Sequence, residues 1–216
     1  MSHPHDAFTS IVHPDVRAYL TALGGADDPL IDRLEAYAIE RNFPLVGRAS
    51  GRVLELLTRL IGGRRVFEFG SGFGFSAFYF ARAVGEGGEV LGAEKDAHEL
   101  AAHDRLYGDH PLRARVRLTQ GDAFEVFDAT TGVFDVVFLD LHKAGYLDAL
   151  RRAVPRVRSG GLILADNVLW GGKTARPAQD ADTATLQRFN EAVFGDARLQ
   201  TVILPVGDGL AVSRVV

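Results

Sequence analysis

Two apolar runs in the middle of the chain each end on an acidic residue. The run at 136–139 is followed by Asp140, and the run at 162–165 is followed by Asp166 and Asn167. Continuous apolar runs are typical of buried parallel strands, and ligands bind beyond the carboxyl ends of such strands. If the two strands are neighbours, three oxygen donors converge, which suits Mg²⁺, Ca²⁺ or Mn²⁺ better than zinc. The pattern predicts a divalent-cation site, with Lys143 close enough to do chemistry beside it.

A glycine-rich turn, Gly70 to Gly74, follows an apolar run at 66–69. Glycines let the backbone approach a ligand closely, and the helix that follows offers free N–H groups. The spacing is G-x-G-x-G, whereas dinucleotide-binding proteins have G-x-G-x-x-G. Glu68 lies in the strand just before the turn, where a carboxylate disfavours a pyrophosphate but attracts an amino or hydroxyl group. Taken alone, the turn could equally be a tight strand-to-helix connection.

Two more acids follow the next predicted strands. Glu94 ends the strand predicted at 89–94, where a carboxylate is typical of ribose binding. Asp122 follows the strand predicted at 116–120, where an acid can accept a hydrogen bond from the adenine amino group. Singly, Glu94 could be a solvated strand end and Asp122 a helix N-cap. Together with a turn that lacks lysine and arginine, they favour a nucleoside cofactor without phosphates that can carry positive charge, and S-adenosylmethionine fits.

The spacing of apolar residues predicts helices first and alternating strands and helices afterwards. The helices are expected at 14–23, from residue 28 or 29 onward, and at 48–61, with the face of the third formed by Val53, Leu56, Leu57, Leu60 and Ile61. Strands are expected at 66–69, 89–94, 116–120, 134–140, 161–166, 199–206 and 210–215, and helices between them at 76–84, 97–107, 123–129, 144–157 and 183–194. This alternation predicts an α/β fold, a doubly wound, mostly parallel seven-stranded sheet. The short link at 206–209 leaves room only for a hairpin, so the C-terminal strand is expected to be antiparallel.

Length and composition set further limits. A chain of 216 residues fits one domain, and we expect a helical lid region at 1–45 and a cofactor-binding core at 46–216. The net charge of −4 gives no indication of nucleic-acid binding, and no apolar run has membrane-spanning length. The absence of cysteine excludes thiolate metal sites and, with no signal peptide visible, fits a cytoplasmic protein. His3 and His5 are interpreted as part of a mobile, solvated tail.

With these residues in view, the chain resembles the cation-dependent class I O-methyltransferases, the group of the caffeoyl-CoA and catechol O-methyltransferases. The resemblance covers about residues 46–216 and is weaker before them. It rests on the segments 67–72 (FEFGSG), 134–140 (FDVVFLD), Lys143 with Tyr146, 165–170 (ADNVLW) with Gly172, and 204–210 (LPVGDGL).

The resemblance implies a role for each matched position. The methionine half of the cofactor would be held by Glu68, Gly70, Ser71, Gly72 and Ser76, with a backbone contact from Val46. Glu94 would bind ribose, Asp122 and Ala123 would lie near adenine, and Asp140 would border the cofactor. Asp140, Asp166 and Asn167 match the metal ligands, and Lys143 matches the catalytic base. The implied reaction is methylation of one hydroxyl of a vicinal aromatic diol by a homodimeric enzyme.

One position departs from the pattern. Many caffeoyl-CoA-type members have an acid where this chain has His142, between Asp140 and Lys143. Hard cations prefer oxygen, so we expect His142 to fill a partly buried edge of the pocket and not to bind the ion. The loop at 171–182 is expected to help roof the pocket, where Lys173 and Arg176 could meet a coenzyme A phosphate or stay solvated.

Three alternatives remain at this point. A nicotinamide-dependent dehydrogenase would share the glycine turn and ribose acid, but its glycine spacing differs and the end hairpin disfavours it. A non-enzymatic nucleoside-binding module would have little use for the oxygen donors or for Lys143. A methyltransferase of the same fold could act on another small acceptor, such as an amine.

Overall fold

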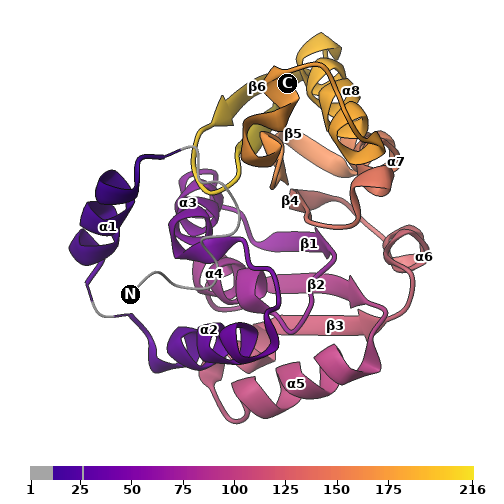
Figure 1. Cartoon of the computed structure of the whole chain (residues 1–216). Coiled ribbons are helices and arrows are strands. Elements are labelled where there is room, and N and C mark those ends of the chain that lie inside the picture. The colour runs from indigo at the N-terminus through magenta and orange to yellow at the C-terminus, as the bar shows by residue number, and fades with distance from the viewer. Residues whose placement is uncertain (1–11, 26) are drawn as a thin grey trace.

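The computed structural model describes residues 12–25 and 27–216, so the tail with His3 and His5 lies outside the described residues. A helical segment precedes the alternating strands and helices, as the sequence predicts (Figure 1). The α-helices are α1 (Pro14–Leu23), α2 (Pro29–Arg41), α3 (Gly47–Leu60), α4 (Phe75–Val84), α5 (Ala97–Tyr107), α6 (Ala123–Ala129), α7 (Tyr146–Ala153) and α8 (Ala181–Gly195).

The strands form a single seven-stranded sheet in the order β3-β2-β1-β4-β5-β7-β6. Their bounds are β1 (Arg65–Phe69), β2 (Glu89–Glu94), β3 (Val116–Gln120), β4 (Phe134–Leu139), β5 (Val157–Ala165), β6 (Leu199–Leu204) and β7 (Leu210–Val215). The first five are parallel, and β7 is inserted between β5 and β6 and is antiparallel to both. This confirms the doubly wound sheet and its antiparallel last strand. From β1 the chain adds β2 and β3 on one side of the sheet, and it then crosses to add β4 and β5 on the other side of β1. The carboxyl ends of β1 and β4 are therefore the topological switch point.

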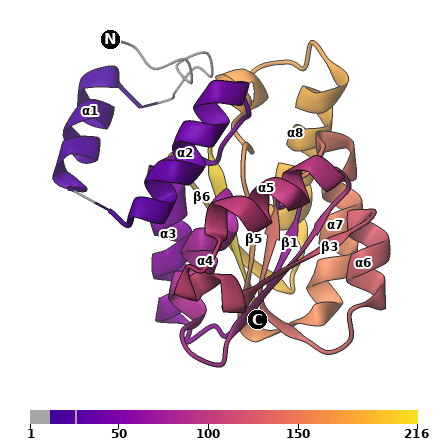
Figure 2. The same cartoon turned by 90° about the horizontal axis from the view of Figure 1, so that it is seen from below.

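Helices cover both faces of the sheet. The helices α2 to α5 pack on one face and α6 to α8 on the other (Figure 2). The alternation of strand side chains explains this, because Val66 packs into the first layer while Phe67 and Phe69 pack into the second. Both faces of β1 are therefore buried, which is why its sequence reads as a continuous apolar run interrupted only by Glu68.

Two predicted helices differ from the structure. The helix predicted at 144–157 is divided into a 3-10 turn (Lys143–Gly145), α7 and a second 3-10 turn (Val154–Arg156). Pro155 accounts for the end of α7, because it cannot donate a helical hydrogen bond. The predicted apolar face of α3 is only partly buried, since Leu56 and Leu60 are 56% and 71% exposed. Instead α3 turns small residues toward the body of the protein, where Gly51 lies against the ring of Tyr79 in α4. Over the residues described, no helix is long and apolar enough to cross a membrane.

A single carboxylate ties together the strand ends that lie opposite the candidate site. Asp135, near the start of β4, accepts hydrogen bonds from the backbone N–H groups of Arg64 and Arg65, both at 2.8 Å. Its other oxygen accepts from Arg158 Nε of β5 at 2.5 Å. Burial opposes the charged form, but these hydrogen bonds outweigh it, so the pKa of Asp135 is below its ordinary value. Asp135 thus fixes the starts of β1, β4 and β5 relative to one another.

Asp135→Ala should lower the free energy of unfolding by about 2 kcal/mol, because it removes the acceptor of three hydrogen bonds, two of them from partly buried donors. The pKa of Asp135 is lower in the folded state, so its stabilisation is complete at neutral pH and declines below about pH 4. Urea unfolding at pH 7 and at pH 3 measures both effects, with Asp135→Asn, which keeps one acceptor oxygen, expected to be intermediate. Equal urea midpoints for wild type and Asp135→Ala at pH 7 would contradict this role.

Candidate active site

The two acid-ended strands are neighbours, as predicted. In the parallel pair β4 and β5, Leu139 is opposite Ala165, so Asp140 and Asp166 follow at the same edge of the sheet. The backbone N–H of Asp140 donates to Phe69 of β1 at 3.0 Å, and that of Asp166 donates to Leu139 at 3.1 Å. These bonds extend the ladder by one residue beyond each strand and hold the two acids in register.

Asn167 and Lys143 complete the cluster. Asn167 has a left-handed backbone with φ of 59°, and its amide nitrogen donates to Asp166 Oδ2 at 3.0 Å. Its amide oxygen accepts a hydrogen bond from Lys143 Nζ. Lys143 is only 8% exposed, and its amine lies 5.4 Å from the ring centroid of Trp170. The lysine therefore belongs to the cluster and is not a solvated residue at a helix start.

The electrostatics of the cluster favour a bound cation. Burial raises the pKa of Asp140, an effect that Lys143 partly offsets. Burial and then the charge of Asp140 raise the pKa of Asp166 well above its ordinary value. Asp166 Oδ1 is buried and has no hydrogen-bond partner among the described residues. No three His, Cys, Asp or Glu side chains come together as a metal site in the described parts of the chain. The oxygen donors that meet here belong to two carboxylates, Asp140 and Asp166, and to the amide of Asn167. An oxygen-only donor set with an unsatisfied carboxylate fits a hard cation.

The glycine turn joins this cluster to β1. Gly70 has a φ of 86°, and a Cβ added to it would overlap the backbone carbonyl of Asp140. Only glycine allows the turn to pass this close to the acid that follows β4. The sequence thus places the predicted cofactor turn against the predicted metal ligand.

Glu68 is a carboxyl group inside the core beside the turn. It is fully buried, and burial raises its pKa to about 8, although the Ser76 and Ser71 hydroxyls partly counter this. Neither carboxyl oxygen has a well-formed hydrogen bond to any described residue, and the Ser71 hydroxyl is likewise buried without a partner. Polar groups buried without partners are uncommon in folded proteins. Their position next to the glycine turn marks a place where a polar ligand group can bind.

Three of the remaining predicted cofactor residues, Glu94, Asp122 and Ala123, lie at or just beyond the carboxyl ends of β2 and β3, and the fourth, Val46, does not. Glu94 is half-buried at the end of β2 and accepts from Gly72 N at 3.0 Å. Asp122 caps α6 by accepting from Phe124 N at 2.9 Å, and it pairs with Lys95 at 2.8 Å. The N-cap interpretation of Asp122 is therefore confirmed, and its contact with adenine stays a prediction, as does that of the half-buried Ala123. Val46 is buried at the start of α3, with its carbonyl near Gly207 of the hairpin between β6 and β7.

The prediction for His142 is wrong. Its side chain is exposed at the start of the 3-10 turn that leads into α7, so it does not fill a partly buried edge. The reason is the direction of that turn, which sends Lys143 and Tyr146 inward and the residue before them outward.

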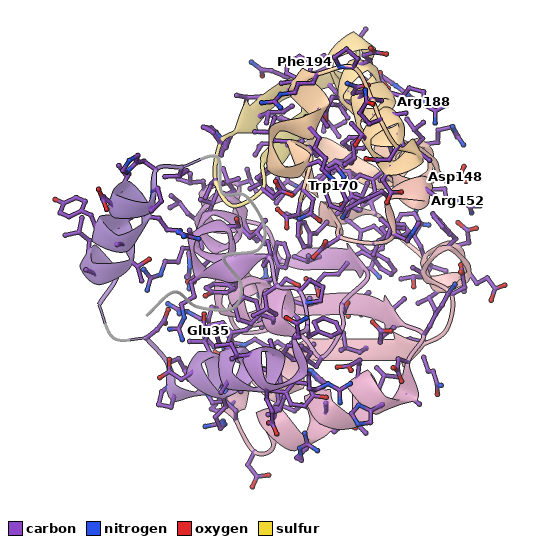
Figure 3. The ribbon with its side chains drawn as sticks, in the orientation of Figure 1. Glu35, Asp148, Arg152, Trp170, Arg188 and Phe194 are labelled. Atoms are coloured by element: carbon purple, nitrogen blue, oxygen red, sulfur yellow. The ribbon has the colours of Figure 1, made fainter. Side chains whose placement is uncertain are left out.

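The sequence analysis gave no role to Asp208, in the hairpin between β6 and β7. Asp208 accepts a hydrogen bond from the backbone N–H of Gly171, and its backbone carbonyl accepts from Leu169 N at 3.0 Å. Burial raises the pKa of Asp208. These contacts hold the turn after Asn167 that carries Trp170, whose side chain lies where this turn meets the C-terminal elements (Figure 3). The sequence signals were the glycines on either side of Asp208 in a short hairpin and the place of this hairpin in the segment 204–210, one of those that carry the family resemblance.

Comparison with known proteins agrees with this geometry. The family model described as O-methyltransferase matches residues 26–216. The chain belongs to the O-methyltransferase family. It is 30% identical to a caffeoyl-CoA O-methyltransferase of Petroselinum crispum over 178 residues, which cover 76% of this chain and 73% of that protein.

Solved structures show the same relationship. The structure of cofactor-bound Rv0187 from MTB superposes with a TM-score of 0.85 and 28% identity, covering 94% of this chain and 96% of the other. A methyltransferase from Geobacter sulfurreducens superposes with a TM-score of 0.80 and 29% identity, covering 95% and 98%. This O-methyltransferase is thus a class I, S-adenosylmethionine-dependent enzyme, which removes the dehydrogenase and the non-enzymatic binding module as alternatives.

Asp166→Asn should stabilise the O-methyltransferase when neither ion nor cofactor is bound. The pKa of Asp166 is higher in the folded state, so the charged carboxylate destabilises the fold at neutral pH and this penalty fades as the pH falls toward 4. The unfolding temperature in excess chelator at pH 7 should rise by about 2–4 °C, as expected for about 1 kcal/mol in a chain of this size.

The matched control is Asp148→Asn. Asp148 lies on the outer side of α7, with its side chain 54% exposed (Figure 3). This variant should melt within about 1 °C of wild type, because exposed ion pairs contribute little. A lower unfolding temperature for Asp166→Asn would show that the carboxylate stabilises the ion-free fold, against the expectation.

Proposed function

We propose that this O-methyltransferase transfers the methyl group of S-adenosylmethionine to one hydroxyl of a vicinal aromatic diol, with the help of a divalent cation. The observation that carries the proposal is the cluster of Asp140, Asp166, Asn167 and Lys143 at the switch point of the sheet. Asp166 and Lys143 are buried, and Asp140 and Asn167 are half-buried. The cluster combines a set of hard oxygen donors with an amine that can accept a proton. Mg²⁺ is the preferred ion, and Ca²⁺ or Mn²⁺ would suit the same donors.

Asp140, Asp166 and Asn167 would hold the ion. When bound, the ion would supply Lewis acidity that makes a diol hydroxyl easier to ionise and fixes its orientation. Lys143 Nζ would take the hydroxyl proton. The oxygen then forms a bond to the methyl carbon while the carbon–sulfur bond breaks, leaving S-adenosylhomocysteine. A cationic donor and an anionic acceptor lose their charges together, so positioning of the two supplies much of the rate.

The cofactor would lie along the carboxyl ends of β1, β2 and β3. The buried Glu68, with Ser71 and Ser76, suits the polar groups of the methionine half, since its oxygens have no well-formed hydrogen bond within the described chain. Glu94 would accept from ribose hydroxyls, and its position at the end of β2 next to the glycine turn supports this role. Gly70, Gly72 and Val46 would contribute backbone contacts, and Asp122 with Ala123 would border adenine.

The proposal has two versions, in which the methyl acceptor is either a large coenzyme A ester or a small free catechol. The relative from Petroselinum crispum is named for a coenzyme A ester, and Lys173 and Arg176 could meet the phosphates of such a substrate. A free catechol would need only the cluster and an aromatic wall, and Trp170, whose ring centroid lies 5.4 Å from Lys143 Nζ, would supply that wall. An amine acceptor on the same fold is the alternative chemistry.

A turnover assay tests the proposal. With S-adenosylmethionine and Mg²⁺, the enzyme should methylate catechol, caffeic acid or caffeoyl-CoA, and excess chelator should lower the rate at least about 100-fold because the hydroxyl then stays protonated. Asp166→Ala should have the same effect in the presence of Mg²⁺, while Asp148→Ala should retain the wild-type rate. Full activity in chelator would exclude the ion, and methylation of amines but of no diol would exclude the acceptor class.

We further propose that the chain forms a homodimer, which the family resemblance favours. In α1 no side chain is buried, and Val16, Tyr19, Leu20 and Leu23 are 48–64% exposed at helical spacing. The helix lies at the outer edge of the molecule (Figure 1). A helix of 10 residues is marginal in water on its own, so a second copy that covers this face would stabilise it.

Light scattering should give the mass of two chains for wild type. Leu20→Asp should give one chain, because it places a charge in the apolar stripe of α1. Val133→Asp, a change at an equally exposed apolar residue just before β4, should leave the dimer intact. A wild-type protein that stays monomeric at all concentrations would contradict the proposal.

A further inference from the structure

Tyr146 occupies a position in the active-site cluster that the proposed mechanism does not use. It is the first residue of α7 and is completely buried. Its hydroxyl accepts a hydrogen bond from Lys143 Nζ at 3.0 Å and donates to the backbone carbonyl of Asp166 at 2.9 Å. One hydroxyl therefore joins the amine to the backbone of the neighbouring acid.

The ring of Tyr146 cannot move freely. It packs edge-on against Phe189 of α8, with ring centroids 5.3 Å apart, and the hydroxyl proton is committed to the Asp166 carbonyl. The remaining lone pair of the oxygen thus points in a fixed direction. Lys143 is three residues earlier in the turn that begins α7, so its flexible side chain meets a rigid acceptor.

The amine of Lys143 has a second fixed acceptor. Its Nζ also donates to the amide oxygen of Asn167, and the rings of Tyr146 and Trp170 flank it at 4.9 and 5.4 Å. An amine nitrogen is tetrahedral, so two hydrogen bonds and the bond to Cε leave a single open direction. This direction holds an N–H in the ammonium form and a lone pair in the neutral form.

We propose that Tyr146 is a positioning residue that, together with the Asn167 amide, aims the open valence of Lys143 at the acceptor hydroxyl. The proposal rests on the proposed function, in which Lys143 takes the hydroxyl proton. Tyr146 touches neither the acceptor nor the cofactor in this scheme and acts only through Lys143. Without its hydroxyl, the amine keeps one acceptor and can rotate about its remaining bonds. Such misplacement of a reacting group by about 1 Å can lower a rate by as much as 100-fold.

A double-mutant cycle tests this role. Tyr146→Phe keeps the ring and its packing on Phe189 but removes both the acceptor for Lys143 and the donor to the Asp166 carbonyl, so kcat should fall about tenfold or more. The KM for the diol and the calorimetric Kd for S-adenosylmethionine should stay within about twofold of wild type. In the Lys143→Ala background, Tyr146→Phe should change kcat less than about twofold, because the group that it positions is already gone.

The matched control is Tyr79→Phe. Tyr79 is another fully buried tyrosine, on α4, and its hydroxyl has no hydrogen-bond partner among the described residues. This variant should keep the wild-type kcat, which separates the position of Tyr146 from the general effect of removing a buried hydroxyl. Cofactor binding by Tyr146→Phe shows that the variant is folded.

The outcomes separate the two proposals. An equal loss of kcat from Tyr146→Phe with and without Lys143 would overturn the positioning role, since a structural defect acts in both backgrounds. A normal kcat for Tyr146→Phe, alongside a large loss for Lys143→Ala, would overturn it and leave the proposed function intact. A normal kcat for Lys143→Ala would overturn both the base assignment and the role of Tyr146.

Discussion

The backbone register of β1, β4 and β5 is the constraint on which the site depends. Each strand continues its neighbour's ladder by one residue, through Asp140 N to Phe69 O and Asp166 N to Leu139 O. These bonds place two acids from separate strands side by side, at the edge where the glycine turn leaves β1. A slip of one residue in either pairing would turn the acid to the opposite face of the sheet. The side chains of the cluster are therefore fixed by the main chain before they make any contact of their own.

The candidate active site contains several acidic side chains and few basic ones. Burial raises the pKa values of Glu68, Asp140, Asp166 and Asp208, and among the described residues Lys143 is the one buried cationic side chain near the last three. Such an arrangement is unfavourable in a closed protein core, where charges need partners. Under the proposed function it would become favourable when positive ligands bind, so the residues that weaken the ligand-free fold would provide its affinity. This is the usual relation between stability and function at a preorganised site.

Most of the fold could be predicted from the sequence because local pattern and tertiary structure agree. The buried strands are apolar runs in the sequence, their polar ends indicated which residues of the candidate site come together, and the short link at 206–209 predicted the hairpin. What could not be predicted depends on contacts between distant segments. The insertion of β7 between β5 and β6, the exposure of His142 and the contact of Tyr146 with the Asp166 carbonyl have no local signature. Leu56 and Leu60 of α3 were predicted to be on the buried face, but they are exposed, because helical periodicity does not show which face of a helix packs against the core.

The hairpin between β6 and β7 also bears on how the protein matures during translation. Val168 N donates to Gly209 O at 3.0 Å, and Gly209 leaves no room for a side chain beside Leu169. The turn that carries Trp170 is thus held by residues that are synthesised after α8 and β6. Domains begin to fold from the N-terminus while synthesis continues, so the cofactor turn and β4 can form early. Because β6 pairs only with β7 among the described strands, the hairpin joins the sheet as a unit when β7 pairs with β5, and the turn that carries Trp170 is held in place only after this last step of synthesis.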